Sequence, residues 1–268
     1  MAYRAPRYCH LHAAREVGAS AITLTVGTAH ADFPVDNLID DRAQTLFKFA
    51  TSVGTPTIIV NLGAGWETGI NRLIIPAGHN CTTVRVAEAD NVGMSGLAYL
   101  CVNTDISGGA LASIDLTASQ DQYLQLIFSA TGQFYIPQLI FTKTVTLTVG
   151  PTLADSPDGY IANVTRINQN TGQSPTVQHG PQQRVVEYTY ENPLDTTDLT
   201  AMESLIADVG MHRPFYVDPH SFSATPDTSD PAICMKFAEM PETRNSTLVP
   251  MSGTESKTFR LSLIESVD

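Results

Sequence analysis

The sequence carries little charge for its length, and this scarcity narrows the classes of function it can serve. Only 16% of its 268 residues are charged, well below the usual quarter, while the hydrophobic share of 43% is ordinary for a globular protein. The formal net charge is −12, and the 15 Lys and Arg residues are scattered along the chain. Nucleic-acid binding needs clustered basic side chains that displace counterions from phosphates. We therefore expect no nucleic-acid partner.

Long apolar runs are also missing. No stretch approaches the ~18 apolar residues that a membrane-spanning helix requires. Residues 1–16 are polar and basic and lack the apolar segment of a secretion signal. The sequence therefore predicts no membrane insertion and synthesis in the cytoplasm.

Cysteine is scarce, and its spacing argues against a metal site. The four cysteines form no CxxC pair. Cys81 and Cys101 lie in apolar, strand-like runs, where a free thiol behaves as a small hydrophobic group. A disulfide between them is possible but has no support in the sequence. We expect folding in a reducing cytoplasm, no bound metal and no cofactor.

Catalytic motifs are absent as well. The chain has no GxSxG, HExxH, GxxxxGK[ST] or calcium-loop pattern, and residues 63–65 (Gly-Ala-Gly) begin a dinucleotide motif that the chain does not complete. Four acidic residues, Asp195, Asp198, Glu203 and Asp208, lie close together in sequence. Helical spacing places them off an apolar stripe, so we expect them to face solvent rather than to form an acid–base pair. The sequence predicts a protein that is not an enzyme.

The first half of the chain has the pattern of a β-sandwich. Short runs rich in β-branched and aromatic residues alternate with Gly, Pro and Asn. These runs predict strands at residues 22–26, 57–62, 71–75, 83–86, 123–128 and 136–141. Residues 33–42 break the pattern with Asp and Asn, which favour a turn or a one-turn helix. The fold class is therefore mainly β, with a jelly-roll sandwich over residues 1–149.

The second half differs in composition. Residues 150–182 are rich in Pro, Asn, Gln, Gly and Thr and have no periodic apolar face, which indicates a linker or excursion loop. Residues 183–268 then form a second unit, a small β-sandwich or barrel with one helix. Its predicted strands span residues 184–190, 214–217, 233–238 and 258–264.

A single apolar stripe predicts the helix of this second unit. Its members recur with helical spacing, and they are Leu199, Met202, Leu205, Ile206 and Val209. Asp195 or Thr196 can cap its first turn, and Gly210 is placed to end it in the left-handed conformation. We expect the stripe to pack over a sheet and to serve assembly.

Three residues near strand ends are candidates for ligand or interface contacts. Trp66, the only tryptophan, follows a glycine-rich turn and could be a stacking platform, an interface anchor or a packing residue. His79 and Asn80 close the run Pro-Ala-Gly-His-Asn, where a side chain can cap a turn or contact a ligand. The sequence leaves these alternatives open.

Several segments of the first unit resemble a known family. The segments are residues 33–42 (Phe-Pro-Val-Asp-Asn-Leu-Ile-Asp-Asp-Arg), 58–63 (Ile-Ile-Val-Asn-Leu-Gly) and 70–80, which ends in Gly-His-Asn. In this order they resemble the discoidin or galactose-binding-like domains of structural proteins in bacteriophage tails. The resemblance covers roughly residues 20–145 and implies a jelly-roll sandwich.

The second unit resembles the small sandwich with one helix in distal tail and minor tail proteins of long-tailed phages. The similarity rests on residues 184–190, the helix of residues 199–209, residues 213–219 (Arg-Pro-Phe-Tyr-Val-Asp-Pro) and the final strand at 259–265. It implies a structural component of the virion tail tip or baseplate, forming a hexameric or trimeric ring of its own copies. The ring would contact tail-tube and baseplate hub proteins.

Distal tail proteins usually carry the ring-forming unit first, whereas here the order is reversed. The identity as a distal tail or a neighbouring minor tail protein therefore stays open.

A second hypothesis is a carbohydrate-binding module that attaches a phage to a host-surface glycan. For that function the sequence offers Trp66, Asn80 and Asn91 as contacts.

Overall fold

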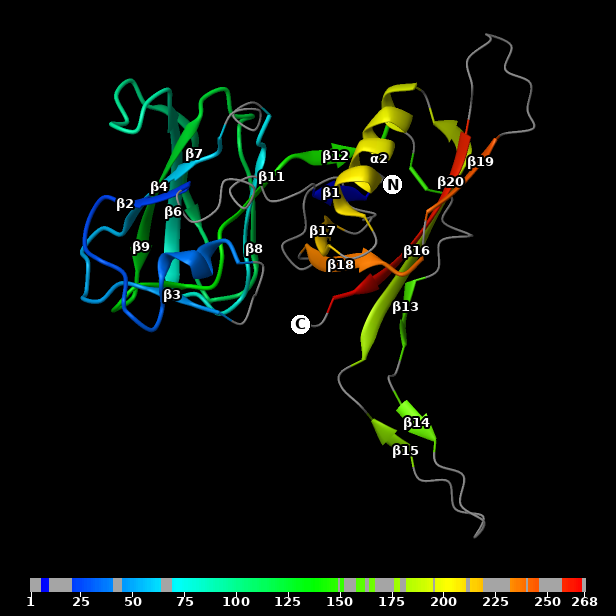
Figure 1. The fold of residues 1–268 in the computed structure, drawn as a ribbon, viewed down its shortest axis with the longest axis horizontal. Coiled ribbons are helices and arrows are strands. Elements are labelled where there is room, and N and C mark those ends of the chain that lie inside the picture. The colour runs from blue at the N-terminus through cyan, green and yellow to red at the C-terminus, as the bar shows by residue number, and fades with distance from the viewer. Residues whose placement is uncertain are drawn as a thin grey trace. The chain divides into compact units, whose positions relative to one another are not determined.

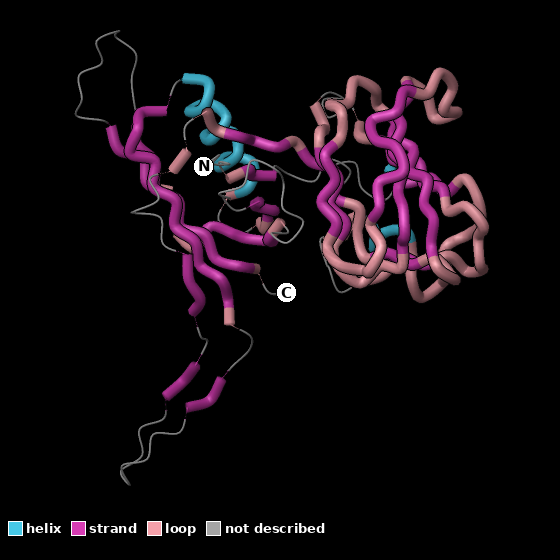
Figure 2. Tube along the Cα trace, turned by 180° about the vertical axis from the view of Figure 1, so that it is seen from behind, coloured by secondary structure: helices cyan, strands magenta, loops and turns pink. Residues whose placement is uncertain are grey.

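The structure is a computed structural model of the full chain. It describes residues 6–9, 21–40, 45–63, 69–148, 150–151, 158–161, 164–166, 176–178, 182–194, 196–210, 213–218, 232–239, 241–245 and 257–266. Strands dominate this part of the chain, and helix is confined to short stretches (Figure 2). The expectation of a mainly β protein is confirmed. No helix of the described residues is long and apolar enough to cross a membrane.

The chain divides into two compact units. One comprises Cys9–Thr144, and the other comprises Val145–Val267 together with Met1–Tyr8. Arg7 and Tyr8 of the strand Arg7–Cys9 thus belong to the second unit, although the sequence pattern assigned residues 1–149 to one unit. A three-residue strand carries no periodicity that could reveal which sheet it joins.

The unit of residues 9–144 is a β-sandwich of antiparallel strands (Figure 1). Its larger sheet has the order β2 (Ile22–Leu24), β4 (Thr57–Asn61), β9 (Tyr123–Ala130), β6 (Cys81–Ala89) and β7 (Ala98–Asp105). Its smaller sheet has the order β11 (Ile140–Thr142), β5 (Arg72–Ile75) and β8 (Ala112–Asp115). Strands β3 (Phe47–Lys48) and β10 (Tyr135–Ile136) form a separate pair.

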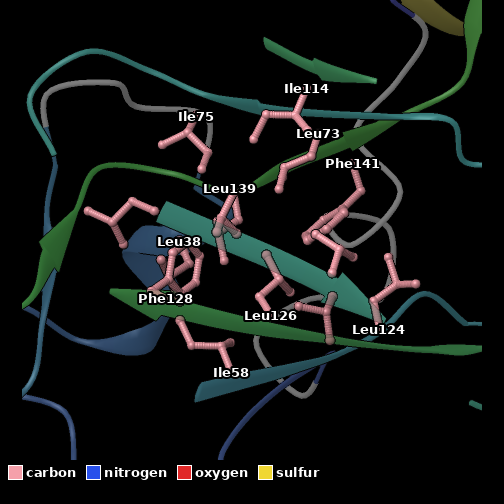
Figure 3. Packing of buried hydrophobic residues seen from close by; sticks show 14 of the residues in the cluster. Leu38, Ile58, Leu73, Ile75, Ile114, Leu124, Leu126, Phe128, Leu139 and Phe141 are labelled. Carbon is pink, nitrogen blue, oxygen red and sulfur yellow. The ribbon is translucent and has the colours of Figure 1, made fainter. Parts of the chain in front are cut away.

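The core of this unit lies between the two sheets. Strand β9 alternates between buried and half-exposed positions, as a strand with one face on a core does. Figure 3 shows the side chains that fill the space, which come from β4, β9, β5, β8 and β11 and include Ile58, Leu124, Leu126, Phe128, Leu73, Ile75, Ile114 and Phe141. All of these are at most 4% exposed. The alternation therefore defines which face of β9 points away from this core.

The expected corner at residues 33–42 is a short 3₁₀ helix, Val35–Leu38. The Asn37 side chain donates a hydrogen bond to the Leu46 carbonyl at 2.7 Å, and Leu38 is fully buried. The polar side chain thus holds the turn, while its apolar neighbour anchors the turn in the core.

The second unit is built on an eight-stranded sheet (Figure 1). Its order is β12 (Thr144–Thr146), β1 (Arg7–Cys9), β17 (Phe215–Asp218), β18 (Ile233–Phe237), β20 (Lys257–Glu265), β16 (Gln183–Leu194) and β13 (Asp158–Ile161), and β19 (Glu242–Asn245) also pairs with β20. The single α-helix of the described residues, α2 (Thr196–Val209), contacts β16. Gly210 follows it with φ +60°, the left-handed ending that the sequence predicted.

The stretch 150–182 contains strands where it is described. Strand β13 pairs with β16, and β14 (Val164–Arg166) pairs with β15 (Thr176–Gln178). The described part of the excursion therefore adds one strand, β13, to the second sheet and forms a separate two-stranded pair, β14 and β15. The polar composition of this stretch gave little signal for strands.

Candidate functional site

The structure gives His79 a structural position. It lies between the glycine turn at Gly78 and strand β6, and it is only 3% exposed. Its Nε2 lies 2.9 Å from the Ala110 carbonyl, and the Gly78 amide donates to the Gly109 carbonyl at 2.8 Å. Burial lowers the pKa of His79, and backbone hydrogen bonding to Ala110 and Cys81 offsets part of that shift. The neutral ring can donate to Ala110 and so ties two loops together.

Asn80 uses its whole side chain to hold a turn. Its Nδ2 donates to the carbonyls of Thr131 and Gln133, both at 2.8 Å. Its Oδ1 accepts a hydrogen bond from the Tyr135 amide at 2.9 Å. These three bonds fix the connection between β9 and β10, and they leave the amide little capacity for a ligand. Trp66, the third candidate from the sequence, lies outside the described residues.

The apolar stripe of α2 is buried. Leu199, Met202, Leu205 and Val209 are at most 9% exposed, and Ile206 is half-buried. The spacing in the sequence therefore identified the inward face of the helix correctly.

One acidic residue of this helix departs from expectation. Asp198 is 3% exposed rather than facing solvent. Its carboxylate accepts hydrogen bonds from the Thr148 amide and, at 2.6 Å, from the Thr148 hydroxyl. The prediction that Asp198 faces solvent is wrong, because a partner 50 residues away satisfies the buried charge. Glu203 and Asp208 are exposed as expected.

Exposed large apolar side chains gather on one part of the sandwich. Among the described residues, five such side chains are exposed, and four of them lie on β7 or on the loop that precedes it: Val92, Leu97, Tyr99 and Val102. We call these four residues the β7 surface. Strand β7 is the terminal strand of the five-stranded sheet. Solvent exposure of several apolar groups in one place is a common feature of binding surfaces.

Tyr99 is the aromatic member of the β7 surface. It is 49% exposed, and the guanidinium carbon of Arg85, on β6, lies 5.1 Å from its ring centroid. The Arg85 Nε is buried and has no hydrogen-bond partner among the described residues. The cation therefore lies beneath the ring and supports one of its faces by a cation–π contact.

The backbone around Tyr99 is irregular. The pairing of β6 with β7 shifts register between Val84 and Val86 and again between Val86 and Ala87. Asn103 adopts φ +41°, an uncommon conformation for a residue other than glycine. Such bulges re-aim side chains and discourage the addition of another strand at a sheet edge. The β7 edge therefore suits side-chain recognition better than strand pairing.

Hydrogen bonds hold the loop before β7. The Asn91 side chain donates to the Ser95 hydroxyl at 2.8 Å, and the Met94 amide donates to the Asn91 carbonyl at 3.0 Å. Met94 packs with Ile59 and Ala89 on the face of the sheet opposite the main core. The loop is therefore anchored to that face, which gives the β7 surface a fixed support.

Acidic groups lie at the same end of the sheet. Glu88 accepts hydrogen bonds from the Gln120 and Asp121 amides at 2.7 and 3.1 Å. A side-chain hydrogen bond between Asp121 and Asp90 raises the pKa of Asp121, with smaller contributions from burial and from the negative charges of Asp90 and Glu88. No group of three or more His, Cys, Asp or Glu residues in the described chain is placed to hold a metal ion.

Sequence reasoning missed Tyr99 and Arg85. The run Leu97-Ala-Tyr-Leu-Cys-Val102 has the composition of a strand, so it contained a signal for β7. The exposure of Tyr99 depends on the position of β7 at a sheet edge and on the bulges, neither of which the local sequence encodes.

Comparisons with known proteins give the following matches. No family model matches the chain, and no curated protein does. Chitosan-binding module 1 of a chitosanase/glucanase from Paenibacillus sp. IK-5 is similar over 45% of this chain and 92% of its own, with 18% identity and a TM-score of 0.38. The module CBM62 of Clostridium thermocellum Xyl5A is similar over 46% and 94%, with 20% identity and a TM-score of 0.38. A CBM32 module of Clostridium perfringens CpGH89, in complex with GalNAc-β-1,3-galactose, is similar over 46% and 96%, with 14% identity and a TM-score of 0.38.

Proposed function

We propose that this chain is a non-catalytic binding protein whose sandwich, residues 9–144, attaches to a carbohydrate through the β7 surface. The observation that carries the proposal is the half-exposed ring of Tyr99 above the Arg85 guanidinium. No bond of the ligand is made or broken in this function.

The chemistry of a sugar ring suits this arrangement. The C–H groups on one face of a pyranose carry partial positive charge and are attracted to the negative face of an aromatic ring. A Tyr with a supported ring loses little conformational freedom when a ligand stacks on it, which reduces the cost of binding. Val102 and Leu97 extend the apolar area beside the ring. Residues 20–145 also resemble galactose-binding-like domains in sequence, and this resemblance supports a sugar as the ligand.

Glycan-array binding followed by calorimetry tests the proposal. We expect saturable, sugar-specific binding by the full chain. Tyr99→Ala should weaken that binding at least tenfold, which corresponds to about 1.4 kcal/mol. Val26→Ala is the matched control, because Val26 is also an exposed apolar residue but lies outside the β7 surface. Wild-type affinity of Tyr99→Ala, or no saturable binding of any glycan, would refute the proposal.

A second candidate function is a structural role in the tail tip of a long-tailed phage. The observation that favours it is that, among the described residues, the path of the eight-stranded sheet ends at β12 and β13. Terminal strands can be covered when neighbouring copies continue a sheet around a closed ring. In this function the chain belongs to a virion, where the ring contacts tail-tube and baseplate hub proteins.

Native mass spectrometry distinguishes this candidate from a monomeric binding module. A closed ring gives one discrete multiple of the 28.9 kDa chain, six or three. Leu205→Asp places a charge at a fully buried position of α2 and should prevent ring formation. Ile206→Asp, at a half-buried position one residue away, is the control and should reduce ring formation less. A purely monomeric wild-type chain at high concentration would count against the ring.

A further inference from the structure

The first strand of the chain fills an internal position in a sheet that is formed by the other end of the chain. Strand β1 lies between β12 and β17 in the eight-stranded sheet. Tyr8 is fully buried and Cys9 is 1% exposed. Without β1, the edges of β12 and β17 would be exposed, together with the apolar surface that now buries Tyr8 and Cys9. We call this position between β12 and β17 the slot.

Two polar contacts secure β1 in this slot. The Arg7 guanidinium donates through Nε to Asp218 Oδ2 at 2.9 Å, and its Nη2 lies 2.7 Å from the same oxygen. Asp218 is at the end of β17, and its side chain is 3% exposed. The Tyr8 and Tyr190 hydroxyls form a buried hydrogen bond of 2.6 Å, and the ring of Tyr8 meets that of Tyr188 edge to face. These contacts recognise a specific Arg-Tyr sequence.

The sandwich of residues 9–144 does not determine which copy of β1 occupies the slot. The members of its buried apolar cluster all lie between Ala21 and Phe141, so β1 contributes nothing to that core. The contacts of β1 join residues 182 and 211 positions apart in sequence. The folded sandwich spans most of this separation, and the chain's own β1 therefore competes with the β1 of another copy at a finite effective concentration.

We propose that β1 is an exchangeable strand, and that the slot between β12 and β17 accepts the β1 of a second copy of this chain. The β1 of another copy has the same Arg7 and Tyr8. It therefore makes the same contacts with the slot, with the same interaction energy as the chain's own β1. Exchange of an identical element is a low-cost route to association. When the concentration of other copies exceeds the effective concentration of the chain's own strand, the copies become linked.

Two full-length variants with complementary defects test this inference. Arg7→Asp impairs the strand and leaves the slot intact, whereas Asp218→Arg impairs the slot and leaves the strand intact. Each variant alone places like charges together and should lower the melting temperature of the second unit. If the strand exchanges, an equimolar mixture refolded together should form a 1:1 complex in native mass spectrometry. In that complex the Asp218→Arg chain supplies an unchanged Arg7, and the Arg7→Asp chain supplies an unchanged Asp218. These two residues can form the original ion pair, so the result does not require the pair with reversed charges to be tolerated.

The double variant Arg7→Asp/Asp218→Arg in one chain is the control for the reversed pair. It should melt at a higher temperature than either single variant. A mixture of the single variants that contains only monomers, with each keeping its lowered melting temperature, would overturn the inference. Single variants that melt like the wild type would also overturn it, because the ion pair would then not hold the strand.

Discussion

Asp198, in the first turn of α2, accepts hydrogen bonds from both the amide and the hydroxyl of Thr148, at distances down to 2.6 Å. The carboxylate is buried and also lies near the positive end of the helix dipole. The sequence spacing predicted that Asp198 faces solvent. Instead, Asp198 attaches the first turn of α2 to Thr148, which follows β12 in the chain.

Asp198→Ala should destabilise the second unit by about 1–3 kcal/mol, because a buried amide and a hydroxyl lose their acceptor. Asp208→Ala is the matched control, since it removes an exposed carboxylate from the same helix. The control should change stability by less than about 0.5 kcal/mol. Urea unfolding measures both values, and equal effects of the two variants would show that the Thr148 contact is unimportant.

Asn80→Ala should destabilise the sandwich by about 1–3 kcal/mol without altering glycan binding. It removes the acceptor of the Tyr135 amide and the donor to two carbonyls, so the turn after β9 loses its attachment. Asn91→Ala, which removes an exposed bond to Ser95, is the control for stability alone and should cost less. Thermal unfolding and calorimetric titration provide the two measurements. A loss of sugar binding in a folded Asn80→Ala protein would restore Asn80 as a ligand contact.

The stability of the sandwich should fall as the pH decreases below about 6.5, in part because of His79. Burial lowers the pKa of His79 from its ordinary value of 6.5, so the unfolded chain takes up a proton that the folded chain excludes. This contribution is fully present above pH 6.5 and is lost between 6.5 and the lower folded pKa. Its slope is at most about 1.4 kcal/mol per pH unit.

His79→Gln keeps an N–H donor for the Ala110 carbonyl and removes the titration. Urea unfolding between pH 7 and pH 5 should therefore show a smaller loss of stability for His79→Gln than for the wild type. Identical pH profiles of the two proteins would mean that His79 does not exclude a proton on folding.

Cys81 should resist alkylation in the folded protein. Burial raises the pKa of its thiol to about 12, so almost no reactive thiolate is present at pH 8. Iodoacetamide treatment followed by peptide mass spectrometry should leave Cys81 unmodified until urea unfolds the sandwich. Cys101, a half-buried free thiol on the neighbouring strand, should react earlier and provides the internal comparison. Equal labelling rates would contradict the buried position of Cys81.

The amino-acid sequence alone determined the elements whose pattern is local. The runs that predicted β4, β5, β9 and β16 are strands, and the stripe from Leu199 to Val209 is the buried face of α2. The corner around Asn37 and the left-handed Gly210 were also predicted, because turns and helix ends depend on the residues that form them.

The tertiary structure decided the positions that depend on distant partners. Arg7 and Asp218 meet across 211 positions, and Asp198 is buried because Thr148 satisfies it. Tyr99 is exposed because β7 ends its sheet and carries bulges, while an equally apolar neighbour, Leu100, is buried. Periodicity reports which side of a strand is apolar. The neighbours of that strand in the sheet determine whether its outer face meets solvent, a ligand or another chain.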